Sequence, residues 1–282
     1  MIGRVLVPLA LAIAATLVAF GSWEASSPPR VRYARLTLRD WPSGEPPLHI
    51  AIASDVHVAG PDMTPGRLRG IVAGINRLHP DLVLLAGDFV SDKKLASIKY
   101  PADQAIGPLA GLRAPLGVVA VLGNHDHWRG ASGVRKALAA AGVIVLANQA
   151  VAKGPLAIGG VDDDFSGNSD LDRTIVALRR TRGARVLLSH TPDLFPRMPG
   201  DVGLMVAGHT HCGQIVLPLI GALASASRYG NRYRCGLIHE AGRTLIVSAG
   251  LGTSILPFRF GAPPDLWLIE VGGAGTSARS AG

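Results

Sequence analysis

Side chains that can bind metal ions follow five apolar runs in this sequence. The ends of these runs read Ser54-Asp55-Val56-His57, Gly87-Asp88, Gly123-Asn124-His125-Asp126, Ser189-His190 and Gly208-His209-Thr210-His211. A single histidine of this kind usually has a structural role. Histidines that only pack in a core would have no reason to follow several apolar runs directly, with glycine just before three of the five motifs. Imidazole, carboxylate and amide ligands together suit manganese, iron or zinc, whereas structural zinc sites favour thiolates. The pattern therefore predicts a metal centre built from separated loops.

The residues between these motifs predict the elements that would bring them together. Apolar runs such as "LHIAIAS", "DLVLLAG" and "GVVAVLG" alternate with segments of helical periodicity. In the first of these segments one helix face carries Leu68, Ile71, Val72, Ile75 and Leu78. This βαβ rhythm indicates parallel strands with helices outside, and functional groups collect at the carboxyl ends of such strands. The later half reads mostly as strands, so we expect a second sheet that faces the first.

The ordered series D-x-H, G-D, G-N-H-D, an isolated His and G-H-x-H resembles the signature of the calcineurin-like metallophosphoesterases, from about Leu48 to Val271. Ser189 departs from it, since many relatives have glycine before the isolated histidine. The stretches "GHTHCGQIVLP", "GVDDD" and "SAGLGTSILPFRFGAPPDLWLIEV" are similar to the membrane-associated bacterial branch that contains YkuE and YaeI. The resemblance implies an α/β fold with two facing mixed β-sheets flanked by helices, a four-layer α-β-β-α sandwich.

The resemblance also implies two divalent cations side by side. Matched motif by motif, the ligands of one cation would be Asp55, His57, Asp88 and His211. The ligands of the other would be Asp88, Asn124, His190 and His209, so that Asp88 bridges the two. Two dications and two aspartates leave a charge of about +2, which can hold a bridging hydroxide and an anionic phosphate. Manganese is the expected metal, with zinc or iron as alternatives.

His125 has no ligand position in this scheme. We expect it to stand over the phosphate and stabilise negative charge or protonate the leaving group, with Asp126 holding its ring in the needed tautomer. The alternative is a structural histidine behind the metal ligands. His127 and Trp128 are expected to pack locally rather than to line a substrate entrance.

Two cysteines and an acidic stretch give weaker signals. Cys212 and Cys235 are too few for a disulfide framework, so two free thiols are favoured over one bridge. Cys212 is not expected to be a metal ligand, because the ligand set is complete without it. The stretch "DDDFSGNSD" has Arg173 where a calcium loop needs an acid. Asp162 or Asp163 is an open candidate for a place near the site.

The N-terminal region predicts a membrane segment. Nineteen uncharged residues lie between Arg4 and Glu24, about the length that crosses the hydrocarbon core of a bilayer. They form either a retained anchor, which we favour, or a signal cleaved near residues 19–21. More arginines follow the segment than precede it, which favours a cytoplasmic domain. Relatives with exported domains favour the extracytoplasmic side, which we adopt.

The expected organisation follows from these parts. We expect a membrane segment and linker over residues 1–30, a metallophosphoesterase domain over 31–271 and a disordered tail over 272–282. Oligomeric state is left open.

The predicted function is metal-dependent hydrolysis of a phosphate ester or pyrophosphate bond by attack of hydroxide on phosphorus. A membrane segment makes an envelope or lipid-linked phosphodiester the expected substrate. A formal charge of +8 favours anionic partners, but an aromatic content of 5% gives little support to specific nucleic-acid binding. P-loop, nucleophile-elbow and dinucleotide motifs do not occur in the sequence. A non-catalytic metal-binding scaffold of the same fold and a nuclease are the alternatives.

Overall fold

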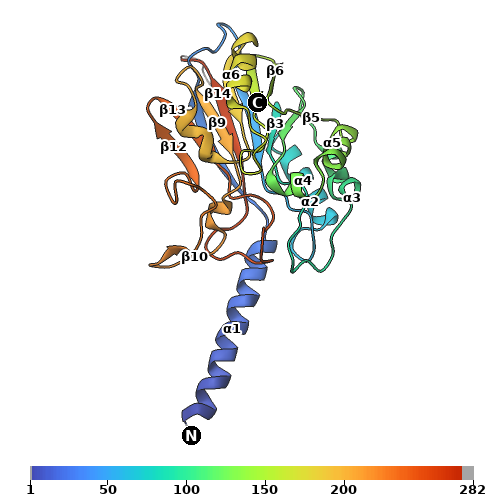
Figure 1. Cartoon of the computed structure of the whole chain (residues 1–282), viewed down its shortest axis with the longest axis vertical. Coiled ribbons are helices and arrows are strands. Elements are labelled where there is room, and N and C mark those ends of the chain that lie inside the picture. The colour runs from blue at the N-terminus through green and yellow to red at the C-terminus, as the bar shows by residue number, and fades with distance from the viewer. Residues whose placement is uncertain (1, 275–282) are drawn as a thin grey trace.

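Within residues 2–274, the part of the chain that this computed structural model describes, two six-stranded sheets form the centre (Figure 1). The strand order of the first sheet is β1 (Arg30–Thr37), β14 (Asp265–Gly272), β2 (Leu48–Ala53), β3 (Leu82–Ala86), β4 (Val118–Val121) and β5 (Val143–Val145). The order of the second is β12 (Gly236–Glu240), β13 (Arg243–Val247), β9 (Leu204–Ala207), β8 (Ala184–Leu188), β7 (Leu156–Gly160) and β6 (Gln149–Lys153). Antiparallel pairs are β14–β2, β12–β13 and β6–β7, and the other neighbours are parallel. The predicted mixed sheets are therefore confirmed.

Helices cover the outer face of each sheet. The first sheet carries α2 (Pro65–Asn76), α3 (Ala102–Ile106), the 3-10 helix η1 (Gly107–Gly111) and α5 (Ala131–Ala140). The second sheet carries α6 (Leu171–Arg180) and the 3-10 helix η2 (Pro192–Arg197). One apolar cluster lies between the sheets and one lies under each helical layer. This is the four-layer sandwich that the sequence predicts.

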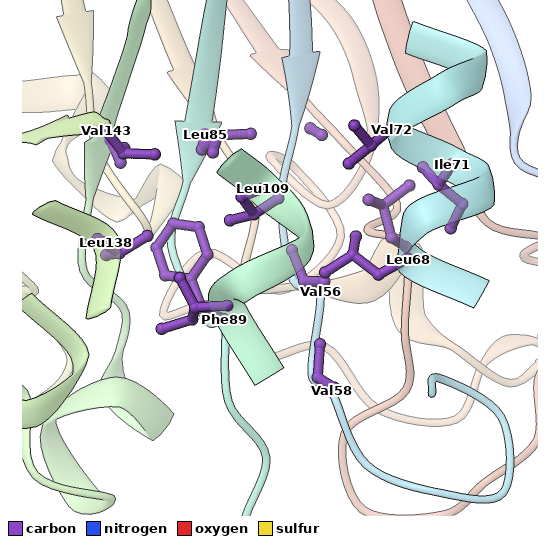
Figure 2. Packing of buried hydrophobic residues seen from close by; sticks show 14 of the residues in the cluster. Val56, Val58, Leu68, Ile71, Val72, Leu85, Phe89, Leu109, Leu138 and Val143 are labelled. Atoms are coloured by element: carbon purple, nitrogen blue, oxygen red, sulfur yellow. The ribbon is translucent and has the colours of Figure 1, made fainter. Parts of the chain in front are cut away.

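The alternation of side chains along the strands builds these layers. In β2, Ile50 and Ile52 enter the core between the sheets, while Ala51 and Ala53 face the helices. Figure 2 shows the cluster between the first sheet and its helices, where Leu68, Ile71 and Val72 of α2 point toward the strands. The predicted apolar face of α2 is confirmed, although the helix ends at Asn76, before Leu78.

The helix α1 (Ile2–Ser26) projects from the body (Figure 1). Residues Val7–Ser26 are long and apolar enough to cross a membrane, and side chains 7–20 are exposed. The C-terminal end of α1 is docked on the body, because the carbonyl of Gly21 accepts the Arg259 N–H at 3.0 Å and Ala25 is buried. At the other terminus, β14 runs to Gly272, and residues 275–282 of the predicted disordered tail lie outside the described residues.

Candidate metal centre

Five strands of the two sheets deliver the predicted ligands to one place. Asp55 and His57 follow β2, Asp88 follows β3, and Asn124 begins the short helix α4 (Asn124–Trp128) directly after β4. His190 follows β8. His209 and His211 follow β9, and His211 opens the 3-10 helix η3 (His211–Gly213). All seven side chains are buried.

Three residues gather their ligating atoms in a first cluster. The Nε2 atoms of His57 and His211 are 3.1 Å apart, and Asp55 Oδ1 lies 3.4 Å from His211 Nε2. Candidate ligand atoms of these residues all lie within 4.8 Å of one another. Two imidazole nitrogens and a carboxylate oxygen that lie this close together can hold a cation, because each offers one ligand atom.

A second cluster lies beside the first, and its Asp88 also faces a histidine of the first cluster. His190 Nε2 is 3.1 Å from Asp88 Oδ2, from Asn124 Oδ1 and from His209 Nδ1. The same Asp88 oxygen lies 3.4 Å from His57 Nε2 in the first cluster. Asp88 therefore lies between the two clusters, and the structure brings together all seven residues that were expected to be ligands.

Burial sets the protonation of the imidazoles. It lowers the pKa of His57 and of His211 well below the ordinary value, and it lowers the pKa of His209 to about 3. Neutral imidazole is the form that binds a metal, so these rings need not lose a proton first.

The carboxylates respond to burial differently. Burial raises the pKa of Asp55 to about 6. Burial also opposes ionisation of Asp88, but the charge and hydrogen bond of His190 outweigh it, and the pKa of Asp88 lies well below its ordinary value. Asp88 in turn holds the pKa of His190 well above its ordinary value against the effect of burial. A positive charge between these carboxylates is thus favoured.

The backbone is strained where the ligands are carried. Among the described residues, Asp55, His57, Asp88, His209 and His211 have φ values between 47° and 70°. Residues other than glycine rarely adopt this left-handed backbone conformation, which costs on the order of 1 kcal/mol for each residue. Strain concentrated at five ligand positions indicates that these loops are shaped for a site rather than for stability.

Two glycines leave space for the carboxylates of Asp88 and Asp55. A Cβ on Gly123 would lie 2.3 Å from Asp88 Oδ1, and one on Gly208 would lie 2.3 Å from Asp55 Oδ2. Both distances are shorter than van der Waals contact, so only glycine fits without displacing a ligand. The glycines that precede these motifs in the sequence are explained by close packing.

Gly123→Ala should therefore weaken metal binding, because the added methyl group pushes Asp88 off its position. We expect affinity for Mn²⁺ to fall by about 10- to 100-fold, as when groups that orient a ligand are lost. Isothermal titration calorimetry measures this. Gly133→Ala in α5 is the control, since a Cβ there meets nothing within 4 Å, and it should leave affinity unchanged. Equal affinities for both variants would contradict the explanation.

His125 stands beside the bridging residue. Its backbone N–H donates to Asp88 Oδ1 at 2.9 Å, and its ring packs edge-on against His57 with centroids 4.6 Å apart. Its Nδ1 lies 2.5 Å from Asp92 Oδ1, and its Nε2 lies 3.3 Å from Ser254 Oγ. His125 also lines the cavity next to the clusters. Its ring is thus oriented by Asp92 and directed at the place where a substrate would lie.

The expected contact between Asp126 and the His125 ring is wrong. Asp126 is fully buried and accepts backbone N–H groups of Asp88, Phe89, Val90 and Gly123 at 2.8–3.2 Å. It therefore joins the loop after β3 to the end of β4 and supports Asp88 from behind. Asp92 takes the place beside the ring. The sequence contained a sign of this role of Asp92, because "GDFVSD" places an acidic residue four positions after Asp88.

A cavity of about 360 Å³ opens beside the clusters. Four of the candidate ligands, Asp88, Asn124, His209 and His211, line it together with His125. Apolar side chains form much of the remaining wall, among them Trp128, Phe165, Leu223, Ile255 and Leu256. Trp128 packs against His125 and Phe165, as the expected local packing requires, and it also lines the cavity. The cavity thus has a polar end at the clusters and a largely apolar wall.

His127 and the acidic residues Asp162 and Asp163 have separate partners. His127 Nε2 pairs with Asp162 at 2.8 Å, so His127 packs locally as expected and Asp162 is engaged there. Asp163 is buried and close enough for its charge to raise the pKa of His190.

The favoured interpretation of free thiols is wrong, because Cys212 and Cys235 form a disulfide with their Cα atoms 4.8 Å apart. The pairing joins η3 to the segment before β12, which only the folded chain brings together. The bridge also removes Cys212 as a candidate ligand.

Comparison with known proteins agrees with this geometry. A family model described as calcineurin-like phosphoesterase matches residues 48–213. The metallophosphoesterase YkuE of Bacillus subtilis is 33% identical over 238 residues, which are 82% of this chain and 81% of that protein. A transmembrane protein with a metallophosphoesterase domain from Danio rerio is 27% identical over 278 residues, 92% of this chain and 61% of that protein. A 5'-nucleotidase precursor structure from Thermus thermophilus aligns with a TM-score of 0.46 and 14% identity, over 79% of this chain and 55% of that one.

Proposed function

Because this chain belongs to the calcineurin-like phosphoesterase family, we propose that it is a phosphodiesterase or pyrophosphohydrolase that uses two divalent cations. The observation that carries the proposal is the convergence of seven buried candidate ligand side chains around Asp88, whose Oδ2 atom approaches both His57 and His190. Mixed nitrogen and oxygen ligands favour manganese, with zinc or iron as alternatives.

The reaction divides between the cations and the chain. Bound cations would polarise a phosphoryl oxygen and lower the pKa of water, so that attack on phosphorus proceeds at neutral pH. His125 would donate a proton from Nε2 to the leaving oxygen or stabilise its charge, since the opposite ring nitrogen is held by Asp92. Asp126 would have no direct part, because its oxygens are occupied by backbone donors.

The substrate is proposed to be amphiphilic, as in an envelope or lipid-linked phosphodiester. Apolar side chains such as Trp128, Phe165 and Ile255 line the cavity beside the polar centre. The membrane-length helix α1 ends at the same body. A phosphate in the metal centre would thus leave the apolar part of the molecule against an apolar wall.

The catalytic domain is proposed to lie on the extracytoplasmic side. The disulfide between Cys212 and Cys235 supports this side, since such bonds persist mainly in oxidising compartments. The arginines that follow α1 argue for the opposite side. Protease treatment of spheroplasts should digest the domain, and protection until the membrane is permeabilised would reverse the assignment.

A metal-dependence assay tests the proposed activity. Full-length protein in detergent, stripped with EDTA, should hydrolyse neither bis-p-nitrophenyl phosphate nor p-nitrophenyl phosphate. Addition of Mn²⁺ should restore activity, with the diester preferred. Metal binding without turnover of either ester would indicate a scaffold, and preferential cleavage of a single-stranded oligonucleotide would indicate a nuclease. Each of those results contradicts the proposal.

A further inference from the structure

An exposed apolar tip lies close to the mouth of the cavity. The strands β10 (Val216–Leu217) and β11 (Gly221–Ala222) form a short hairpin whose turn carries Leu219 and Ile220. Leu219 is fully exposed and Ile220 is 72% exposed. Ile255, which lines the cavity, is 75% exposed. The hairpin lies between Ile215 and Leu223, which both line the cavity, and aliphatic side chains this exposed indicate a contact with another apolar phase.

The hairpin is joined to the docked end of α1 by a continuous set of contacts. The Val216 N–H donates to the Phe260 carbonyl at 2.7 Å, and the Phe260 N–H donates to the Gln214 carbonyl at 2.9 Å. The ring of Phe260 lies 5.3 Å from that of Phe20 in α1. The adjacent Arg259 N–H binds the Gly21 carbonyl of α1. The hairpin therefore has a fixed position relative to the membrane-length helix.

The position of α1 indicates where the bilayer surface would be. Val7–Ser26 comprises 20 residues, a length of about 30 Å that matches the hydrocarbon core. Trp23, a residue type enriched at membrane interfaces, is exposed near its C-terminal end. In Figure 1 the hairpin lies at the level where α1 meets the body, and α6 lies toward the opposite end.

We propose that Leu219 and Ile220 insert into the bilayer surface that α1 enters, which directs the mouth of the cavity at lipid headgroups. The inference rests on the membrane placement of α1 in the proposed function and deepens it by assigning a docking surface. The occupant is the bilayer, because the apolar tip is continuous with the helix end that would lie in the membrane. Amphiphilic substrates could then enter the centre without leaving the membrane entirely.

A probe of the environment tests the contact without reference to catalysis. The full chain carrying Ile220→Cys is labelled with an NBD fluorophore and reconstituted into phosphatidylcholine–phosphatidylglycerol vesicles. We expect a blue shift of emission and quenching by doxyl-labelled lipid. The control is Val176→Cys on α6, an exposed apolar position on the other part of the body, which should show neither. A water-like emission at position 220 in vesicles, or a shift that depends on protein concentration alone, would overturn the proposal.

A pair of substrates separates docking from chemistry. Leu219→Ser combined with Ile220→Ser should leave the rate on soluble bis-p-nitrophenyl phosphate within about twofold, because neither residue lines the cavity. The rate on hexadecyl p-nitrophenyl phosphate in vesicles should fall by about tenfold or more, since burial of even one of the two side chains contributes about one such factor. Equal losses on both substrates would overturn the docking role. If the parent protein hydrolyses neither, the proposed activity fails, and the fluorescence still decides the contact.

Discussion

Asp88→Asn should abolish metal binding at the shared position and reduce hydrolysis by more than about 10³-fold, beyond the loss of a single transition-state hydrogen bond. Asparagine keeps the shape of the side chain and can still accept the His125 N–H, which lies 2.9 Å from Asp88 Oδ1. It also tolerates the φ of 57° at this position. The change therefore removes a charge and one anionic ligand of both clusters while the fold is kept.

Metal content and rate are measured together for this variant. Elemental analysis after Mn²⁺ loading should give fewer than the two ions per chain expected of the parent, and the diesterase rate should fall to background. Asp170→Asn is the matched control, because Asp170 caps α6 through the Arg173 N–H and asparagine caps equally well. It should keep both metal and rate. Normal turnover by Asp88→Asn would exclude a bridging role and with it the proposed mechanism.

His125→Ala should retain its metal and still lose about 10² to 10⁴ in rate, the usual contribution of a general acid. The loss should be larger for an alkyl phosphodiester than for bis-p-nitrophenyl phosphate, because a poor leaving group depends more on protonation. Comparison of the two substrates at saturating Mn²⁺ measures this. His239→Ala is the control, since His239 lies on β12 with Thr244 as its partner. A uniform loss with both leaving groups would leave His125 as an electrostatic rather than a proton-donating residue.

Asp92 should act through His125 as a positioning residue. Asp92→Asn should lower the rate by about 10- to 100-fold with metal content unchanged, as for other groups that orient a functional ring. The loss should follow the same leaving-group order as His125→Ala and should nearly vanish in the His125→Ala background. Asp92→Glu should restore part of the rate. A loss that is undiminished without His125 would show that Asp92 acts elsewhere.

The candidate residue types were predictable because metal chemistry restricts them, and the resemblance to a known family implied which seven of them are ligands. Histidine, aspartate and asparagine directly after apolar runs are costly to keep unless they bind something, and the order of the motifs carried this information. The orientation of Asp126 was not predictable. Asp126 is adjacent to His125 and lies in the same helical turn, but its carboxylate accepts backbone N–H groups of the loop after β3. The ring of His125 contacts Asp92 from that loop instead.

The apolar environment was predictable only in part. The hydropathy of residues 5–23 marks a membrane-length segment by composition alone. The amino acids of the hairpin at 216–222 give no comparable signal, because a few aliphatic residues in a loop are common. Their significance comes from contacts with Phe260 and through it with α1.

The sequence by itself determined the α/β class, the helix face of α2, the membrane-length segment and the seven ligand candidates. The first three follow from local rules, namely side-chain periodicity and hydropathy, whereas the assignment of the ligands follows from the resemblance of the ordered motifs to a known family. Only the tertiary structure decided that β14 pairs between β1 and β2, that Cys212 meets Cys235, and that Asp92 rather than Asp126 holds His125. Each of these is a contact between segments whose meeting depends on the packing of the whole chain, which no local pattern records.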